Sequence, residues 1–326
     1  MSIEMLVQQN RTNRTFDISE LVGDVEWTTS IITSQPGKLL FKYVEDAAVN
    51  PEEGDFVRFR FNGRGVFLGR IFKKKRNQKG IMEVTAYDSM RFLKNKQTYN
   101  LQAMTSAQIF RMLCREHELA FRVVNDSFVA VPAKLHENKS LYSILKNAFE
   151  TTLISNREWY FVRDNFGVLE HVHINSQQTP LVIGDNSMAS GYEFTGSIDD
   201  DTFNRVRLVR ENPETNRREI YIVQNSSNIN RWGRLQFSET VDANLNPGQV
   251  EARAELILQA KNRRTRELKI SALGDLRIRA GNGVVTSIER LRNEGFANIQ
   301  RTIVCQCTHK WSKGAHVMDL EMRTVN

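Results

Sequence analysis

The sequence contains very little cysteine. Only three cysteines, Cys114, Cys305 and Cys307, occur in 326 residues. Three thiols cannot build the disulfide network that stabilises small secreted domains, and so few are typical of proteins that fold in a reducing compartment. The scarcity excludes a disulfide scaffold and favours a fold that is stabilised by buried apolar side chains.

Long hydrophobic runs are also missing. No stretch approaches the roughly 20 apolar residues that a membrane-spanning helix needs. The first residues, MSIEMLVQQNRTNRTF, lack the apolar centre of a secretion signal. We therefore expect no membrane partner and no signal peptide, and a protein that acts in the cytoplasm or leaves the cell without the usual signal.

Catalytic motifs are absent as well. The chain has no G-x-S-x-G nucleophile elbow, no H-E-x-x-H zinc motif and no P-loop. Most acidic residues fall on polar strand faces or in turns, where solubility explains them. We expect no enzymatic activity, no catalytic residue, no cofactor and no metal. A cell-wall hydrolase that uses two unrecognised carboxylates stays open as an alternative.

The sequence does contain a pattern of short strands. In Asp55–Phe61, apolar Val57, Phe59 and Phe61 alternate with Arg58 and Arg60, as in a half-buried strand. Eighteen phenylalanines against six prolines favour β-cores over linkers. The length predicts two to four domains.

The predicted fold is mainly β with an α+β insertion. It has two tube-like antiparallel β-barrels, a small α+β domain and a helix-containing insertion. A capping box at Thr105–Gln108 begins the first predicted helix, and Asn246-Pro247 begins another. The predicted domains are residues 1–98 (first barrel), 99–175 (α+β), 176–235 with 265–326 (second barrel) and 236–264 (helical insertion).

A short internal similarity supports two related barrels. Gly54-Asp55 precedes a strand that carries arginines, and Gly274-Asp275 does the same. Each segment then reaches a Gly-x-Gly turn followed by valine, Val66 or Val284. The comparison predicts that one β-module occurs twice, with the α+β domain between the copies.

The C-terminal stretch Thr302–Val325 holds two cysteines and two histidines, His309 and His316. In a strand, Cys305 and Cys307 share a face with His309. Zinc sites usually use C-x-x-C, and C-x-C within a strand fits them poorly. Because a buried cysteine behaves as a small hydrophobe, we expect a core hairpin and no stoichiometric zinc.

Three other candidate sites are weak. His171 and His173 lie on one strand face without a third ligand, so we expect two histidines on a polar face. The acidic triplet Asp199–Asp201 lacks the spacing of an EF-hand, so we expect an ordinary acidic loop. Cys114 lies on the apolar face of the first predicted helix, which favours a core residue over a nucleophile.

Positive charge is the remaining candidate feature. The net charge is +7 and the isoelectric point about 9.3, with the densest cluster at Lys73–Lys79. This cluster separates two predicted strands, so we expect the tip of a hairpin. Aromatic residues do not alternate with the basic ones as they do on a base-stacking surface. A nucleic-acid-binding protein with OB-like barrels is therefore kept only as an alternative.

Several segments together resemble a known family. They are Glu53–Asp55, Gly65–Ile71, Val84–Asp88, Phe92-Leu93, Phe203–Val206, the helix after Pro247, Gly281–Val285, His309–Trp311 and Met318–Leu320. They resemble baseplate hub proteins of contractile phage tails. The closest resemblance is to hubs of PBSX-type defective prophages and tail-like bacteriocins, and late-control-protein-D hubs and the base of type VI spikes are more distant.

The resemblance implies a structural role. Three copies would form a trimeric ring of six similar barrels that adapts the hexameric tail tube to the threefold central spike. The implied partners are tail tube rings, the spike protein and other baseplate proteins, with nucleic acid only passing through the lumen. Assembly would occur in the bacterial cytoplasm, before incorporation into the baseplate.

The resemblance also places the C-terminal hairpin. Cys305, Cys307, Met318, Leu320 and Met322 would line the core of the second barrel. His309 and Trp311 would lie near its rim, at a contact between subunits.

Overall fold

The computed structural model describes residues 2–32, 35–46, 49–185, 187–199, 201–212, 215, 217–243, 245–294 and 299–324. The chain is mainly β, as predicted. It divides into two compact units. The large unit comprises Met1–Glu150, Trp159–Glu193 and Leu268–Asn326, and the small unit comprises Thr151–Glu158 and Phe194–Glu267. The four predicted domain boundaries stay predictions.

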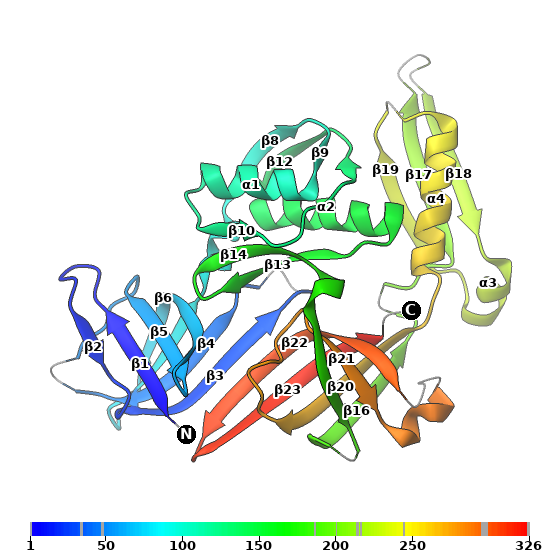
Figure 1. Ribbon diagram of the computed structural model, residues 1–326. Coiled ribbons are helices and arrows are strands. Elements are labelled where there is room, and N and C mark those ends of the chain that lie inside the picture. Colours follow the sequence, from blue (N-terminus) through cyan, green and yellow to red (C-terminus); the bar gives the residue numbers. More distant parts are fainter. Residues whose placement is uncertain are drawn as a thin grey trace. The chain divides into compact units, whose positions relative to one another are not determined.

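One extended sheet organises the large unit (Figure 1). Its strands are β1 (Ile3–Gln8), β2 (Thr15–Asp17), β3 (Val22–Ser30), β4 (Lys38–Val44), β5 (Phe56–Phe61), β6 (Arg64–Arg76), β7 (Ile81–Tyr87), β15 (Gln178–Gly184), β16 (Ala189–Ser197), β20 (Thr265–Leu273), β21 (Gly283–Ser287), β22 (Gln300–Ser312) and β23 (Ala315–Thr324). Their spatial order is β16-β20-β23-β22-β3-β4-β7-β6-β5-β1-β2, and β21 pairs with both β15 and β22.

This sheet contains the same strand arrangement twice. The neighbours β3-β4-β7-β6-β5 correspond to β16-β20-β23-β22-β21, and the two sets follow the same order along the chain. Gly54 N–H donates to Ile71 O at 2.8 Å, and Gly281 N–H donates to Val304 O at 2.8 Å. Both glycines have positive φ, +97° and +91°.

The predicted equivalence of Gly54 with Gly274 is therefore wrong. The hydrogen bonds of Gly54 are repeated at Gly281, and Gly274 instead follows the end of β20. A positive φ favours glycine because it lacks a Cβ. The two Gly-Asp dipeptides are similar in sequence only, whereas the shared backbone conformation belongs to Gly54 and Gly281.

The two halves of the sheet do not close separately. Closing a barrel requires its first and last strands to pair. Here β3 pairs antiparallel with β22, for example through Thr28↔Thr308 and Trp27↔His309. Since β22 occupies that edge of β3, the first half stays open between β2 and β3, and the prediction of two closed barrels is not confirmed.

The first half encloses a hydrophobic core. Phenylalanines and valines at alternate positions point inward, in agreement with the pattern of the 55–61 segment. The core includes Met5, Val7, Trp27, Phe41, Phe59, Val84 and, from β22, Trp311. Trp311 thus connects the C-terminal hairpin to the first half.

The α+β region follows the short helix η1 (Ser89–Lys94). It contains β8 (Lys96–Leu101), β9 (Met104–Thr105), α1 (Ser106–Glu116), β10 (Phe121–Val123), β11 (Ala130–Val131), β12 (Lys134–Ser140), α2 (Leu141–Asn156), β13 (Tyr160–Asn165), β14 (Val168–His173) and η2 (Ile174–Gln177). The capping box of α1 is confirmed, because Thr105 and Gln108 exchange side-chain-to-backbone hydrogen bonds.

The small unit has its own sheet. Its elements are β17 (Arg205–Asn212), β18 (Arg217–Gln224), α3 (Ser226–Trp232), β19 (Gln236–Val241) and α4 (Pro247–Lys261). The strand order is β18-β17-β19. Helix α4 begins at the predicted Asn246 cap, and its Val250, Ala254 and Ile257 pack with Val206 and Leu208 of β17. Within the described ranges, no helix combines the length and apolar character required to cross a bilayer.

Candidate assembly surface

A stack of aromatic rings and histidines joins the two halves of the sheet. The His309 ring stacks with Trp27 of β3 at 5.4 Å and with Trp311 at 5.7 Å between ring centroids. Trp311 in turn stacks on His316 at 4.6 Å. Phe59 and Phe61 of β5 contact Trp311 from the side. The β3–β22 pairing is therefore supported by packed rings as well as by backbone hydrogen bonds.

Hydrogen bonds define the protonation of the two histidines. His309 Nε2 lies 2.8 Å from Ile278 O, which can only accept, and His309 Nδ1 lies 3.0 Å from His316 Nε2. A neutral His309 with its proton on Nε2 satisfies both contacts, with His316 donating to Nδ1. Burial lowers the pKa of His309 to about 4 and also lowers that of His316.

The predicted position of His309 and Trp311 at a rim is wrong. The two residues are 0% and 2% exposed, because the rings of Trp27, Phe59 and His316 pack against them. The core assignment of Cys305, Cys307, Met318, Leu320 and Met322 is confirmed by their burial. Burial also raises the pKa of Cys307, which keeps its thiol protonated.

No group of three or more potential metal ligands gathers in the part of the chain that the structure describes. His309 contacts His316 and Ile278 O. The absence of stoichiometric zinc stays a prediction.

His171 is a core residue, so its predicted location on a polar face is wrong. It is fully buried on β14 and stacks on Tyr160 with 5.0 Å between centroids. Its Nδ1 lies 2.7 Å from Asn125 O and its Nε2 3.1 Å from Ser106 Oγ. A serine beside a histidine resembles a nucleophile with its base. However, Ser106 is also fully buried, so the pair satisfies polar atoms in the core.

His173, Cys114 and the acidic triplet have structural roles. His173 is half-buried, and its Nδ1 accepts a hydrogen bond from Asn175 N. Burial raises the pKa of Cys114 to about 12, as expected for a core thiol. In the acidic triplet, Asp201 forms an ion pair with Lys261, and Asp200 lies outside the described residues.

A buried ionic cluster was missed by sequence reasoning. The Arg279 guanidinium donates to Asp164 O, and Asp88 and Asp164 are 5% and 6% exposed. Burial raises the pKa of both carboxyls, that of Asp164 to about 6. Asp88 caps η1 by accepting from Met90 N at 3.0 Å. No local pattern relates positions 88, 164 and 279, because the fold alone brings them together.

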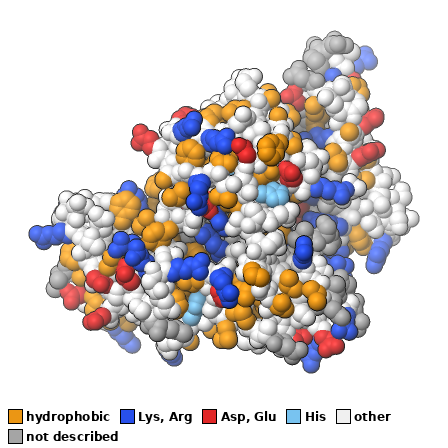
Figure 2. All heavy atoms as spheres, viewed as in Figure 1, with side chains coloured by type: hydrophobic (Ala, Val, Ile, Leu, Met, Phe, Trp, Pro, Cys, Tyr) orange, Lys and Arg blue, Asp and Glu red, His pale blue; other side chains and the backbone are white. Residues whose placement is uncertain are grey.

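The basic cluster lies mainly on a strand. Lys73–Arg76 belong to β6, and only Asn77–Gly80 form the turn. Three of the cations contact carboxylates of the chain itself: Lys74 with Glu53 (3.9 Å), Lys75 with Glu83 (3.4 Å) and Arg76 with Glu45 (2.7 Å). Figure 2 shows Lys and Arg side chains scattered among hydrophobic and acidic ones. These features do not favour a nucleic-acid-binding surface.

The outer face of the second half carries a polar groove. The groove has a volume of about 490 Å³ and lies across β16, β20, β23 and β22. Tyr192, Glu193, Lys269, Asp319 and Glu321 are among its lining residues. It runs beside β16, which is the last strand on this side of the sheet. A sheet edge beside a groove is a candidate for contact with another chain.

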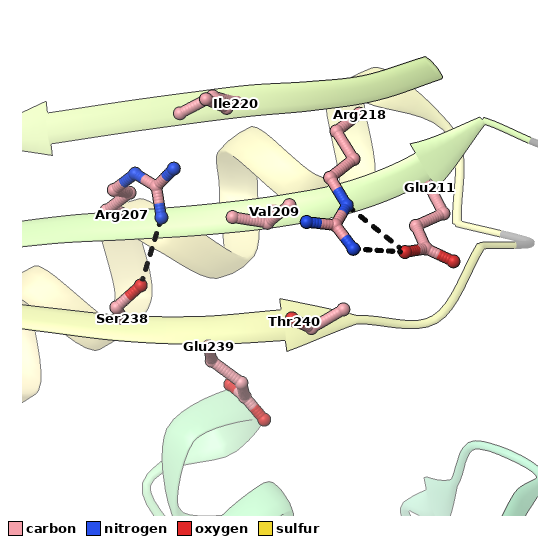
Figure 3. Close-up of a pocket in the computed structure, with 8 residues that line it drawn as sticks. All are labelled: Arg207, Val209, Glu211, Arg218, Ile220, Ser238, Glu239 and Thr240. Carbon is pink, nitrogen blue, oxygen red and sulfur yellow. Dashed lines mark hydrogen bonds and ion pairs between the residues drawn. The ribbon is translucent and has the colours of Figure 1, made fainter. Parts of the chain in front are cut away.

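In the small unit, Arg207, Val209 and Ile220 lie on the face of the sheet opposite α4 (Figure 3). Val209 and Ile220 are paired across β17 and β18, and Ile220 is 52% exposed. Arg218 lies 3.3 Å from Glu211 at one end of this face. The shallow cavity here measures about 270 Å³. Its mixed apolar and charged lining is suited to a protein contact and contains no catalytic arrangement.

Two proteins of Bacillus subtilis are similar to most of the chain, and one of them belongs to a phage-like element. Residues 25–323 match the family model described as YQBQ-like. The chain is 26% identical over 292 residues to YqbQ of Bacillus subtilis strain 168, covering 87% of this chain and 86% of YqbQ. It is also 26% identical over 274 residues to XkdQ of the phage-like element PBSX in the same strain, covering 83% and 81% of the two chains.

Solved structures show the same fold at low sequence identity. The tail protein from Neisseria meningitidis MC58 superposes with a TM-score of 0.70 at 12% identity, covering 99% of this chain and 97% of that one. The Escherichia coli protein c3393, described as a component of the type VI secretion system, gives 0.56 at 13% identity, covering 94% and 74%.

Proposed function

The chain belongs to the YQBQ-like family, and from this premise we propose that it is a structural baseplate hub of a contractile phage tail or phage-tail-like particle. The resemblance to PBSX-type proteins is confirmed by the similarity to XkdQ. The proposed role is non-enzymatic. The protein would assemble in the bacterial cytoplasm and then enter the baseplate.

The observation that carries the proposal is the repeated five-strand arrangement within one chain. Three copies of a chain with two similar halves present six similar units around one axis. Such a homotrimer can contact a sixfold tail tube ring on one side and a threefold spike on the other. In this proposal, nucleic acid would only pass through the lumen.

Two related folds support the proposal. The Neisseria protein is described as a tail protein. The description of c3393 adds a structural similarity to the T4 bacteriophage tail proteins gp27 and gp5. The proposed partners of our chain are accordingly tail tube rings, a central spike protein and other baseplate proteins.

The test is the mass of the purified protein in solution, followed by electron microscopy of the same sample. We expect a particle of three chains and a ring with an axial hole and six similar lobes. A monomer at all concentrations, both alone and with its tube protein, would refute the hub. Retention on DNA that falls steeply with salt would instead favour the nucleic-acid alternative.

A further inference from the structure

The two halves differ in the strand pairing of their long strand, which is β22 in the second half and β6 in the first half. In the second half, β22 pairs with β21 over Gln300–Ile303 and with β3 over Gln306–Trp311. In the first half, β6 pairs with β5 over Arg64–Arg70. Among the described residues, no strand pairs with Lys73–Arg76 on the side of β5.

Local geometry shows that these two segments are equivalent. The pairing of β6 with β7 shifts register between Ile71 and Lys73, and that of β22 with β23 shifts between Val304 and Gln306. Ile71 N donates to Asp55 O, and Val304 N donates to Asn282 O, both at 2.9 Å.

A third pair of contacts extends the correspondence beyond the bulge. Lys74 Nζ donates to Pro51 O, and Cys307 Sγ contacts Ile278 O at 3.8 Å. Pro51 and Ile278 each lie three residues before the equivalent glycines. Lys73–Arg76 therefore occupy the position of Gln306–His309, the part of β22 that receives β3.

The counterpart of β3 also has a free side. β3 pairs with β4 and β22, whereas β16 pairs only with β20 within the described sheet. Its residues Ser190–Glu193 are all exposed and include no proline, lysine or arginine. Proline, lysine and arginine usually protect edge strands from pairing. The other edge strand here, β15, contains Pro180.

We propose that β16 of one copy pairs antiparallel with the Lys73–Arg76 segment of β6 in a second copy. This contact repeats between chains the β3–β22 contact that exists within the chain. Three such contacts would alternate with three internal ones and close a ring. The inference rests on the proposed hub function and identifies the strands that hold its subunits together.

Charge supports this choice of occupant. Arg76 is exposed on β6, and Glu193 is exposed on β16. In the β3–β22 register, His309, the equivalent of Arg76, faces Trp27 in the second half of β3. Arg76 would therefore lie near Glu193 across the new strand pair. Backbone hydrogen bonds would supply most of the contact, as in other cases of strand addition.

Engineered disulfides test the contact directly. Directly opposite residues in an antiparallel pair lie about 4.5–5.5 Å apart at Cα, within the range that a disulfide spans. In the β3–β22 register, Gln306 faces Ser30, the last residue of β3, so Lys73 should face the last residues of β16. We would combine Lys73→Cys with Thr195→Cys, Gly196→Cys or Ser197→Cys in separate full-length variants. The native cysteines are all buried, so oxidation should join only the new pairs. We expect covalent dimers and trimers from at least one combination.

The matched control is Lys79→Cys with the same three partners. Lys79 lies in the turn beyond the free edge, so we expect no covalent ladder from these variants. Circular dichroism of every variant checks that the fold is retained. If the protein is a trimer by mass and no combination cross-links, the strand contact is refuted while the hub stands. If it is a monomer without cross-links, both are refuted.

Charge exchange provides a second measurement. Arg76→Glu or Glu193→Arg alone should weaken the trimer by about two- to fivefold per contact, the range of an exposed ion pair. The double variant should recover the wild-type midpoint of dissociation. An unchanged midpoint in both single variants would contradict the proposed proximity of these side chains.

Discussion

The histidine pair at the β3–β22 junction predicts that the protein loses stability in mild acid. Protonation of His309 would place hydrogens on both nitrogens that meet between His309 and His316, at a separation of 3.0 Å. The hydrogen bond would then be lost. Asp275 raises the pKa of His309, whereas Arg279 and His316 lower it, and burial is the largest effect.

The magnitude follows from the pKa of His309. It is 6.5 in an exposed chain and about 4 in the fold, a difference that corresponds to about 3 kcal/mol. Between these values the folded protein binds fewer protons than the unfolded chain, so the free energy of unfolding falls as pH falls. The contribution is complete above about pH 6.5 and is largely lost by about pH 4.

The assay is denaturant unfolding of the wild type and of His309→Gln at pH 7.5 and pH 4.5. Glutamine keeps one donor for Ile278 O and one acceptor for His316 but does not titrate. We expect His309→Gln to be about 1 kcal/mol less stable at pH 7.5, because the ring stacking is lost. We also expect its stability to fall by about 2–3 kcal/mol less than that of the wild type on acidification.

The comparison between variants removes the contributions of groups that do not contact residue 309. His171, with a pKa of about 4, contributes in the same direction in both proteins. Asp164, whose pKa is raised to about 6, contributes in the opposite direction in both. If wild type and His309→Gln lose the same free energy between the two pH values, His309 is not a neutral core residue and the geometry above is wrong.

Three further predictions concern buried groups. Arg279→Ala should cost about 3–5 kcal/mol at pH 8, because Asp88 and Asp164 lose their cation, and the cost in denaturant unfolding should be smaller at pH 5, where the acids can protonate. Gly281→Ala should cost about 1–3 kcal/mol, since φ is +91° and a Cβ would lie 2.3 Å from the Phe161 ring. Gly23→Ala is the control, because a Cβ there would meet only Lys42 O, at 4.0 Å. Equal melting temperatures of Gly281→Ala and Gly23→Ala would contradict the argument. Elemental analysis should find no stoichiometric zinc, and one zinc ion per chain would disprove this.

Local features of the fold were predictable because their causes are local. The capping boxes at Thr105 and Asn246 satisfy backbone donors within one helical turn. The alternation in β5 follows from the two faces of a strand. Neither depends on residues far away in the sequence, so both could be identified from the printed chain.

Long-range pairing was not predictable in the same way. Thr28 and Thr308 lie 3.1 Å apart at their hydroxyls but 280 positions apart in the sequence. The sequence alone therefore predicts a rim position for His309, although the Trp27 ring of β3 stacks on it. The sequence shows the charge of the basic cluster. Its unpaired edge, however, depends on the position along β6 at which the pairing with β5 ends. That position is set by strand register and leaves no mark in composition.

The equivalence of β6 and β22 also explains why their chemistry differs. Cys307 and His309 are buried, and their strand pairs with β3 of the same chain. Their counterparts, Lys74 and Arg76, carry charge on an edge that would be covered only when another copy arrives. A free apolar edge would aggregate before assembly, and positive charge is a common protection against this. Glu193 on β16 would then favour pairing with this one positively charged strand. The same backbone position is therefore uncharged where the strand pairs within its own chain and charged where it would pair with another copy.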